Sequence, residues 1–182
     1  MSRFDYAEYV KVSEVAKVIR GVRVVRNQLS REGKYPVYQN SMKPLGYYDK
    51  YNCHAGTVFV ISAGAAGDIG YSYVDFWAAD DCLYIIPDER LEDRYLYHVL
   101  LWQQYAIYSR VRRSAVPRLS KAVIEGLIIP LPPLEIQQET IRILDKWSDA
   151  NNGLIAEIER ELELRRQQYG YYRDKLLSFN VS

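Results

Sequence analysis

Two short segments of this chain carry side chains suited to polar recognition. The first, Arg112-Arg113-Ser114-Ala115-Val116-Pro117-Arg118, is basic and stiffened by proline, and arginine suits phosphate groups and the paired acceptors of guanine. The second, Tyr38-Gln39-Asn40-Ser41-Met42-Lys43, presents amide side chains, and Gln or Asn offers adenine a matched donor and acceptor. For each segment alone, an ordinary solvated loop is an equally good interpretation.

A glycine-rich connection, Ser62–Gly70, is the other segment whose composition suggests chemistry. Its glycines, Gly64, Gly67 and Gly70, have neither the dinucleotide-binding spacing nor the Lys-Ser/Thr ending of a phosphate loop, and a strand rather than a helix is expected after them. The connection therefore predicts a tight or bulged hairpin that needs small residues.

The residue types of catalytic and metal sites occur without the required spacing. His54 and His98 are the only histidines, and only Cys53 adjoins one of them; neighbouring residues do not easily share one tetrahedral ion. No Gly-x-Ser-x-Gly nucleophile motif occurs, and Leu131-Pro132-Pro133-Leu134 lacks the polar and aromatic residues of a methyltransferase motif. We expect no catalytic residue, no metal and no cofactor, and so a chain that is not an enzyme by itself.

Composition restricts the remaining function classes. The formal net charge is +1, so no overall basic field indicates nucleic acid, but residues 20–43 and 110–121 are basic while residues 75–93 are acidic. Cys53 and Cys82 are too few for a disulfide framework, and the N-terminus has no export pattern. No apolar run reaches the ~20 residues that cross a bilayer. We expect a cytoplasmic protein without membrane contact.

Periodicity and end signals predict an α+β body. Ser120 and Gly126 mark the start and end of a short helix, and apolar residues at near-3.6 spacing predict the main helix over Leu91–Val111. The expected strands are Tyr35–Tyr38, Thr57–Ile61, Tyr71–Phe76, Cys82–Ile86 and Leu127–Ile129, and a further short helix, capped by Ser13, is expected over Ser13–Ile19.

The last third of the chain predicts one long helix that begins at a proline cluster. Ile129-Pro130-Leu131-Pro132-Pro133 ends the preceding element, because proline fits a helix start and not its interior. From Leu134 to Phe179 a stripe recurs at alternating steps of three and four residues, the repeat that faces a partner helix. Such a helix spans roughly 65 to 70 Å at about 1.5 Å per residue, although Asn151-Asn152-Gly153 favours a break.

This stripe, called the seam below, mixes apolar and polar positions. If the helix packed back onto the body, too little of the chain would remain to cover so long a stripe. A partner helix is therefore the preferred interpretation. Flanking charges such as Glu159 and Arg173 fit a parallel or an antiparallel pair equally well. The seam residues are Leu134, Gln137, Ile141, Leu144, Ser148, Asn151, Ile155, Ile158, Leu162, Arg165, Tyr169, Tyr172, Leu176 and Phe179.

The C-terminal half resembles a known family, the specificity subunits of type I restriction-modification systems. The resemblance is carried by Val116-Pro117-Arg118-Leu119-Ser120, by Ile129-Pro130-Leu131-Pro132-Pro133-Leu134-Glu135-Ile136-Gln137, by Ile143-Leu144-Asp145, by Glu163-Leu164-Arg165-Arg166-Gln167-Gln168-Tyr169 and by Lys175-Leu176-Leu177. Tyr35–Asn40 and Val60–Gly70 are similar to weaker landmarks of the family's target recognition domain.

The resemblance implies two recognition domains held apart by two antiparallel helices, each domain reading one half of a bipartite site in double-stranded DNA. It implies no catalysis in this subunit, because separate modification subunits methylate adenine and a restriction subunit cleaves. This chain has one domain and one helix where the family has two of each, so it resembles half a subunit. We predict a target recognition domain over residues 1–133 and a spacer and dimerisation helix over residues 134–182.

Two hypotheses follow. In the first, two copies of the chain dimerise through the helix and place identical domains on an interrupted palindrome. In the second, the chain is a truncated fragment that pairs with other halves or occupies modification subunits without directing methylation. The predicted DNA-binding residues are Gln39, Asn40, Lys43, Arg112, Arg113 and Arg118. The predicted dimer-interface residues are Ile155, Ile158, Leu162, Tyr169, Tyr172 and Leu176.

Overall fold

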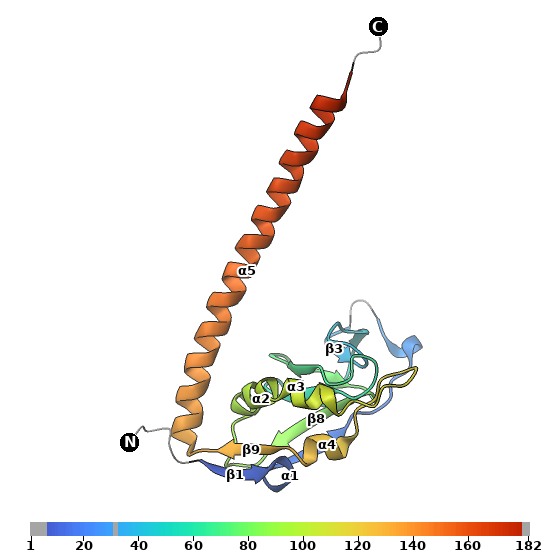
Figure 1. Ribbon diagram of the computed structural model, residues 1–182. Helices are drawn as coiled ribbons and strands as arrows, with labels where there is room; N and C mark the ends of the chain where they lie inside the picture. The colour runs from blue at the N-terminus through green and yellow to red at the C-terminus, as the bar shows by residue number, and fades with distance from the viewer. Residues whose placement is uncertain (1–6, 31–32, 180–182) are drawn as a thin grey trace, which may run out of the picture. The chain divides into compact units, whose positions relative to one another are not determined.

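A computed structural model describes residues 7–30 and 33–179 of the chain (Figure 1). It confirms the predicted α+β class, a mixed body and a long C-terminal helix. The chain divides into two compact units, residues 1–141 and residues 142–182, and each is described by itself. None of the helices in the described part of the chain is both long and apolar enough to cross a membrane.

An antiparallel four-stranded sheet, in the order β2-β8-β5-β6, forms the centre of the first unit. Its strands are β2 (Ala16–Arg20), β5 (Val58–Ile61), β6 (Ile69–Tyr71) and β8 (Cys82–Pro87). Val58 and Val60 of β5 belong to the main core, whereas Phe59 and Ile61 belong to a second core on the other side. Burial of both faces explains why β5 is apolar throughout rather than alternating.

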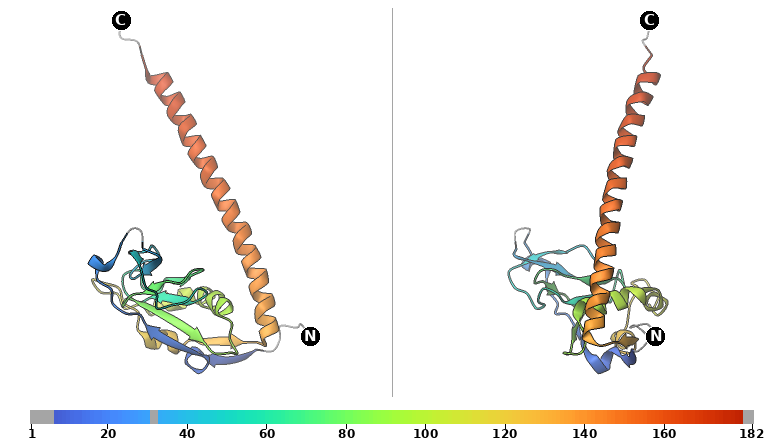
Figure 2. Two further views of the ribbon diagram at one scale, coloured as in Figure 1. Left: turned by 180° about the vertical axis from the view of Figure 1, so that it is seen from behind. Right: turned by 90° about the vertical axis from the view of Figure 1, so that its left-hand side faces the viewer.

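Two smaller sheets complete the unit. The strands β1 (Glu8–Lys11) and β9 (Ile128–Leu131) are far apart in sequence and pair antiparallel; they lie side by side in Figures 1 and 2. The third sheet has the order β4-β3-β7, with β3 and β7 parallel. Its strands are β3 (Tyr35–Tyr38), β4 (Gly46–Tyr48) and β7 (Trp77–Ala78).

Short helices cover the main core. The helix α2 packs on β5 and β6 and buries Leu96 and Leu100 completely, while α4 contacts β2. The helices are α1 (Val12–Val15), α2 (Asp93–Trp102), α3 (Gln104–Ser109), α4 (Lys121–Glu125) and α5 (Leu134–Leu177), with one 3-10 turn at Arg26–Gln28.

The predicted helix over Ser13–Ile19 is wrong beyond its first turn. Only Val12–Val15 is helical, and no side chain caps this turn. Ala16–Arg20 is instead the strand β2, whose whole length pairs with β8. Val18 and Ile19 are β-branched and fit a strand well, and pairing with a central strand outweighs the weak helical preference of so short a segment.

Two other predicted elements have different bounds. The strand expected over Tyr71–Phe76 lies at Ile69–Tyr71, and Ser72 leaves it by donating from its hydroxyl to the carbonyl of Val74 at 2.6 Å, a local bond that competes with the strand ladder. The single helix expected over Leu91–Val111 divides at Gln103, whose side-chain amide donates to the carbonyl of Ile128 at 2.7 Å. The other expected strands and the short helix after Ser120 are present within one or two residues.

The helix α5 is continuous over 44 residues and passes through Asn151-Asn152-Gly153 without a break. Its first turns belong to the first unit. There Ile141 packs against the main core, and Gln137 is fully buried. Gln137 was expected in the partner-facing seam, and that expectation is wrong, because its side chain is enclosed by its own domain.

Candidate nucleic-acid interface

The segment after β3, residues 39–43, is called the amide loop. Its start is attached to β8, because the thiol of Cys82 lies 3.2 Å from the carbonyl oxygens of both Tyr38 and Gln39 and donates to them. Asn40 and Lys43 are exposed. The loop therefore has a fixed base and side chains that are accessible to a ligand.

The segment after α3, residues 112–118, is called the arginine loop. It closes on itself, because the amide of Arg112 donates to the carbonyl of Arg118 at 2.8 Å and the amide of Arg118 returns a bond of 3.1 Å. The hydroxyl of Ser114 donates to the carbonyl of Val116 at 2.6 Å. Arg112, Arg113 and Arg118 are all exposed, so the closed loop presents three cations to solvent.

The glycine loop, residues 62–68, joins the other two. The amide of Ala65 donates to the carbonyl of Asn40 at 2.9 Å, and the amide of Gly64 donates to the carbonyl of Pro117 at 3.2 Å. Gly64 has a φ of 82°, and a Cβ there would lie 2.7 Å from the oxygen of Asn40. The structure thus brings all three loops together, and the glycines serve a tight connection between antiparallel strands, as the sequence predicted.

A tyrosine that sequence reasoning did not single out holds the glycine loop against α3. The hydroxyl of Tyr108 donates to Asp68 Oδ1 at 2.7 Å, and Gln104 Nε2 donates to that hydroxyl at 3.0 Å. Partial burial, and then the bond to Asp68, raise the pKa of Tyr108 to about 12. A Cβ on Gly67 would lie 2.6 Å from the Tyr108 ring, so Gly67 is the sequence signal of this close approach.

The cysteines and His54 do not form a reactive group in the structure. Burial raises the pKa of the Cys53 thiol to about 12 and raises that of Cys82 as well, so both are neutral thiols, and thiolate character is needed for reactivity. His54 is largely exposed, with Nδ1 3.6 Å from Asp75 Oδ1. Within residues 7–30 and 33–179, no three potential metal ligands come together.

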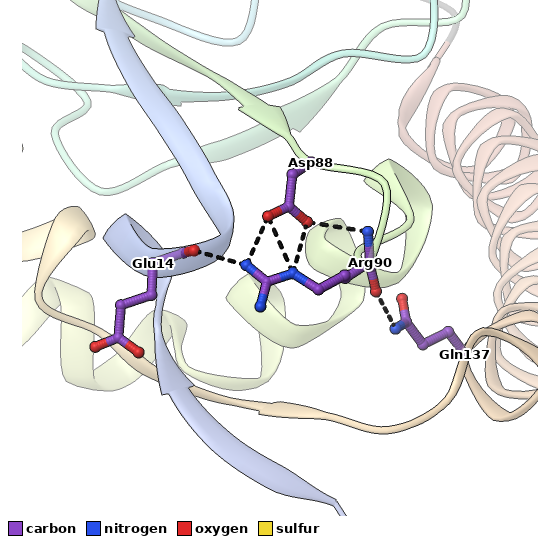
Figure 3. Close-up of polar contacts among 4 residues, drawn as sticks. All are labelled: Glu14, Asp88, Arg90 and Gln137. Atoms are coloured by element: carbon purple, nitrogen blue, oxygen red, sulfur yellow. Dashed lines mark hydrogen bonds and ion pairs between the residues drawn. The ribbon is translucent and has the colours of Figure 1, made fainter.

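The base of α5 is joined to the segment before α2 through Gln137. Its Nε2 donates to the carbonyls of Arg90 and Pro132, both at 2.8 Å, and its Oε1 accepts the amide of Glu92 at 2.9 Å. Figure 3 shows the bond between Gln137 and Arg90 together with the side-chain contacts of Arg90, whose guanidinium lies 2.7 Å from Asp88 and donates to the carbonyl of Glu14 at 2.8 Å. Hydrogen bonds from Arg90 hold the pKa of Asp88 below its usual value.

The predicted dimer-interface residues are all exposed on α5. Their exposed fractions lie between 46% for Ile155 and 72% for Leu176. Polar residues on the same helix form local contacts, such as Arg165 with Glu161 one turn away at 3.4 Å. The second unit therefore carries an apolar stripe whose side chains are available to a partner.

Comparison with known proteins identifies the family. Residues 5–164 match the family model for the type I restriction modification DNA specificity domain. The chain is 31% identical, over 95% of its length, to a Haemophilus influenzae protein named as a type I restriction enzyme specificity subunit, and covers 46% of that protein. It is 33% identical over 52% of its length to a type I restriction enzyme specificity subunit of Escherichia coli.

The fold is shared with a solved protein of the same kind. The type I restriction-modification system S subunit from M. genitalium superposes with a TM-score of 0.74 at 18% identity, over 98% of this chain and 49% of that one. This chain thus spans about half the length of the Haemophilus influenzae and M. genitalium proteins. With the family model matching most of its residues, the chain belongs to the family of type I restriction modification DNA specificity domains.

Proposed function

We propose that this chain is a DNA sequence-recognition subunit of a type I restriction-modification complex. In this proposal residues 1–133 form one target recognition domain and residues 134–182 form a spacer and dimerisation helix. The observation that carries the proposal is the match to one half of a solved S subunit over nearly all of this chain. The meeting of the amide, glycine and arginine loops supports it, because it places amide and guanidinium side chains on neighbouring loops, the side chains that read base edges and hold phosphates.

The partner that we propose for α5 is a second copy of the chain. Two copies would supply the two domains and two helices of a full-length relative, and the exposed seam residues would pack between the helices. A two-fold dimer places identical domains in inverted orientation, so its site is an interrupted palindrome. Modification subunits, and through them a restriction subunit, would carry out adenine methylation and cleavage.

A second function uses the same helix differently. A fragment with an exposed seam can pair with another half subunit or occupy modification subunits without directing methylation. The length of the chain, about half that of the Haemophilus influenzae and M. genitalium proteins, is compatible with this function too. The two functions differ in whether a methylated motif exists.

The deciding experiment is to express the chain with its modification subunit in a host that lacks other type I specificity subunits, and then to map methylated adenines by single-molecule sequencing. We expect an interrupted palindrome with one methylated adenine in each half. A stable complex that yields no motif would support the pairing fragment instead. An asymmetric motif would contradict a dimer of identical halves.

A further inference from the structure

Four arginines surround one pocket of about 310 Å³ in the first unit. They come from three places in the sequence: the end of β2, the residue after α3, and the two ends of the arginine loop. No carboxylate lines the pocket. Its lining residues are Arg20, Ser62, Arg110, Arg112, Arg118, Leu119 and Ser120.

Backbone structure holds these cations close to one another. The mutual backbone bonds of Arg112 and Arg118 place the two residues opposite each other, a position in which like charges repel. Leu119 follows at once and donates its amide to the carbonyl of Ser62 at 2.8 Å. The fold thus maintains a concentration of positive charge that a bound anion would stabilise.

The guanidinium groups have unused donors. Arg20 Nη1 donates to the carbonyl of Asp80 at 2.8 Å, which leaves most of its five N–H groups. Within the part of the chain that the structure describes, the side chains of Arg110, Arg112 and Arg118 have no hydrogen bond or ion pair to another residue. Arg90 is the contrast, because its guanidinium is already occupied by Asp88 and Glu14 (Figure 3).

The chemistry of the pocket selects a phosphate rather than a base edge. Guanidinium groups offer donors only, and their fork geometry matches the oxygens of a phosphate. A guanine edge presents two acceptor atoms and no negative charge, so it would leave the positive charge of the four arginines uncompensated. Ser62 and Ser120 add hydroxyl groups at the same pocket.

We infer that this pocket binds a single backbone phosphate of the DNA. The inference rests on the proposed function, and it separates the predicted DNA-binding arginines into those that hold this phosphate and Arg113, which does not. Arg20, Arg110, Arg112 and Arg118 hold the phosphate. Arg113 lies outside this group and lines a separate hollow with Gly64, Asp68 and Tyr108. The phosphate contact sets the register of the domain on the duplex and carries no sequence information.

The test measures how the DNA affinity of the full chain, in complex with its modification subunit, depends on salt concentration. Two labelled duplexes are compared, one that contains the mapped motif and one with a scrambled sequence. Arg110→Gln should lower the slope of log affinity against log salt by about 1 for each domain on the duplex, about 2 for the proposed dimer, because each copy loses one cation at its phosphate. The loss should be equal on both duplexes. Arg110→Lys should keep the slope, because the charge remains.

The matched control is Lys17→Gln. Lys17 lies three residues before Arg20 on β2 and is exposed, and residues an odd number apart on a strand point to opposite faces. This variant removes the same charge from the other face and should leave the slope unchanged. Thermal unfolding of each variant checks that the fold is retained.

A second arm uses duplexes with one neutral methylphosphonate at successive backbone positions. One position in each half-site should weaken binding of the parent protein and should weaken binding of Arg110→Gln less, because that variant has already lost one of the four cations at the phosphate. An unchanged salt slope in Arg110→Gln, or a changed base preference, would overturn the inference. The chain could also direct no methylation and still show the Arg110-dependent salt slope on the scrambled duplex. That result would support the phosphate site and contradict the proposed function.

Discussion

Gln137 is the residue on which the start of α5 depends most directly. It is fully buried and makes three side-chain hydrogen bonds, to the backbones of Arg90, Glu92 and Pro132. The sequence alone places it in a regular seam, because its spacing from Leu134 and Ile141 is helical. Only the position of the α2 entry segment reveals that it faces inward and satisfies backbone groups that would otherwise be buried without partners.

Gln137→Leu should lower the free energy of unfolding by about 2 to 4 kcal/mol, since it leaves one buried and two partly buried backbone groups without their partner. Urea unfolding of the purified chain measures this change. Gln138→Leu is the control, because Gln138 is exposed and makes one bond, to Glu92; its effect should stay below about 1 kcal/mol. Equal effects of the two variants would contradict the role given to Gln137.

Tyr108 is predicted to order the glycine loop through its hydroxyl. Tyr108→Phe removes the bond to Asp68 and should lower stability by about 1 kcal/mol, with faster amide exchange at Gly64 and Ala65. Hydrogen exchange measured by mass spectrometry reports both. Tyr105→Phe, at a tyrosine that is 87% exposed, should change neither; a similar change there would show that the hydroxyl of Tyr108 is not responsible.

Asp93 makes the stability depend on pH. Burial, and then the charge of Glu92, raise its pKa from 3.8 to about 6, so the folded state binds this proton more tightly than the unfolded state does. Its contribution to stability is therefore full below about pH 4, falls as the pH rises to 6, and stays low above that.

Asp93→Asn removes this titration. The variant should match the parent near pH 4 and exceed it by about 1 kcal/mol or less at pH 7.5, a value reduced for partial solvent exposure. Chemical unfolding at the two pH values measures the difference. Greater stability of the parent at pH 7.5 would mean that the ionised carboxylate is favourable at the start of α2, as a helix dipole alone would make it.

At the scale of elements, local patterns predicted types better than bounds. Strands β5 and β8 were predicted from short β-prone or apolar runs, and both lie in the central sheet. The error at Ser13–Ile19 arose because a few residues have no strong local preference, and pairing between β2 and β8 decides their conformation. The continuity of α5 through Asn151-Asn152-Gly153 shows the opposite case, in which long flanking helical segments outweigh a weak site.

Leu162 and Leu164 test the seam within one element. Leu162 lies in the seam and Leu164 does not, yet they are 53% and 58% exposed. Leu162→Glu should raise the dimer dissociation constant at least about tenfold, or 1.4 kcal/mol, because it places an uncompensated charge in the interface. Leu164→Glu should leave it near the parent value. Light scattering over a concentration series measures both, and a monomeric parent chain would contradict the dimer itself.

At the scale of the whole molecule, the proposed symmetry couples the two halves of the DNA site. Arg113→Ala changes both copies at once. We expect weaker binding and either a relaxed preference at one base in each half-site, if the guanidinium reads a base, or a shallower salt slope, if it holds a phosphate. Methylated-adenine mapping and salt titration separate these outcomes. A change confined to one half-site would argue against two identical domains.

The α+β class, most of the strands, the proline-marked start of the long helix and the family could be predicted before the fold was known, because they depend on local residue preferences and on motifs that are contiguous along the chain. Three features came from the folded structure alone: backbone bonds join residue 65 to residue 40 and residue 64 to residue 117, Gln137 faces inward, and Arg20 shares a pocket with Arg110 and the arginine loop. These contacts join segments that are distant in sequence. Their geometry is set by strand pairing and core packing, which local preferences do not encode.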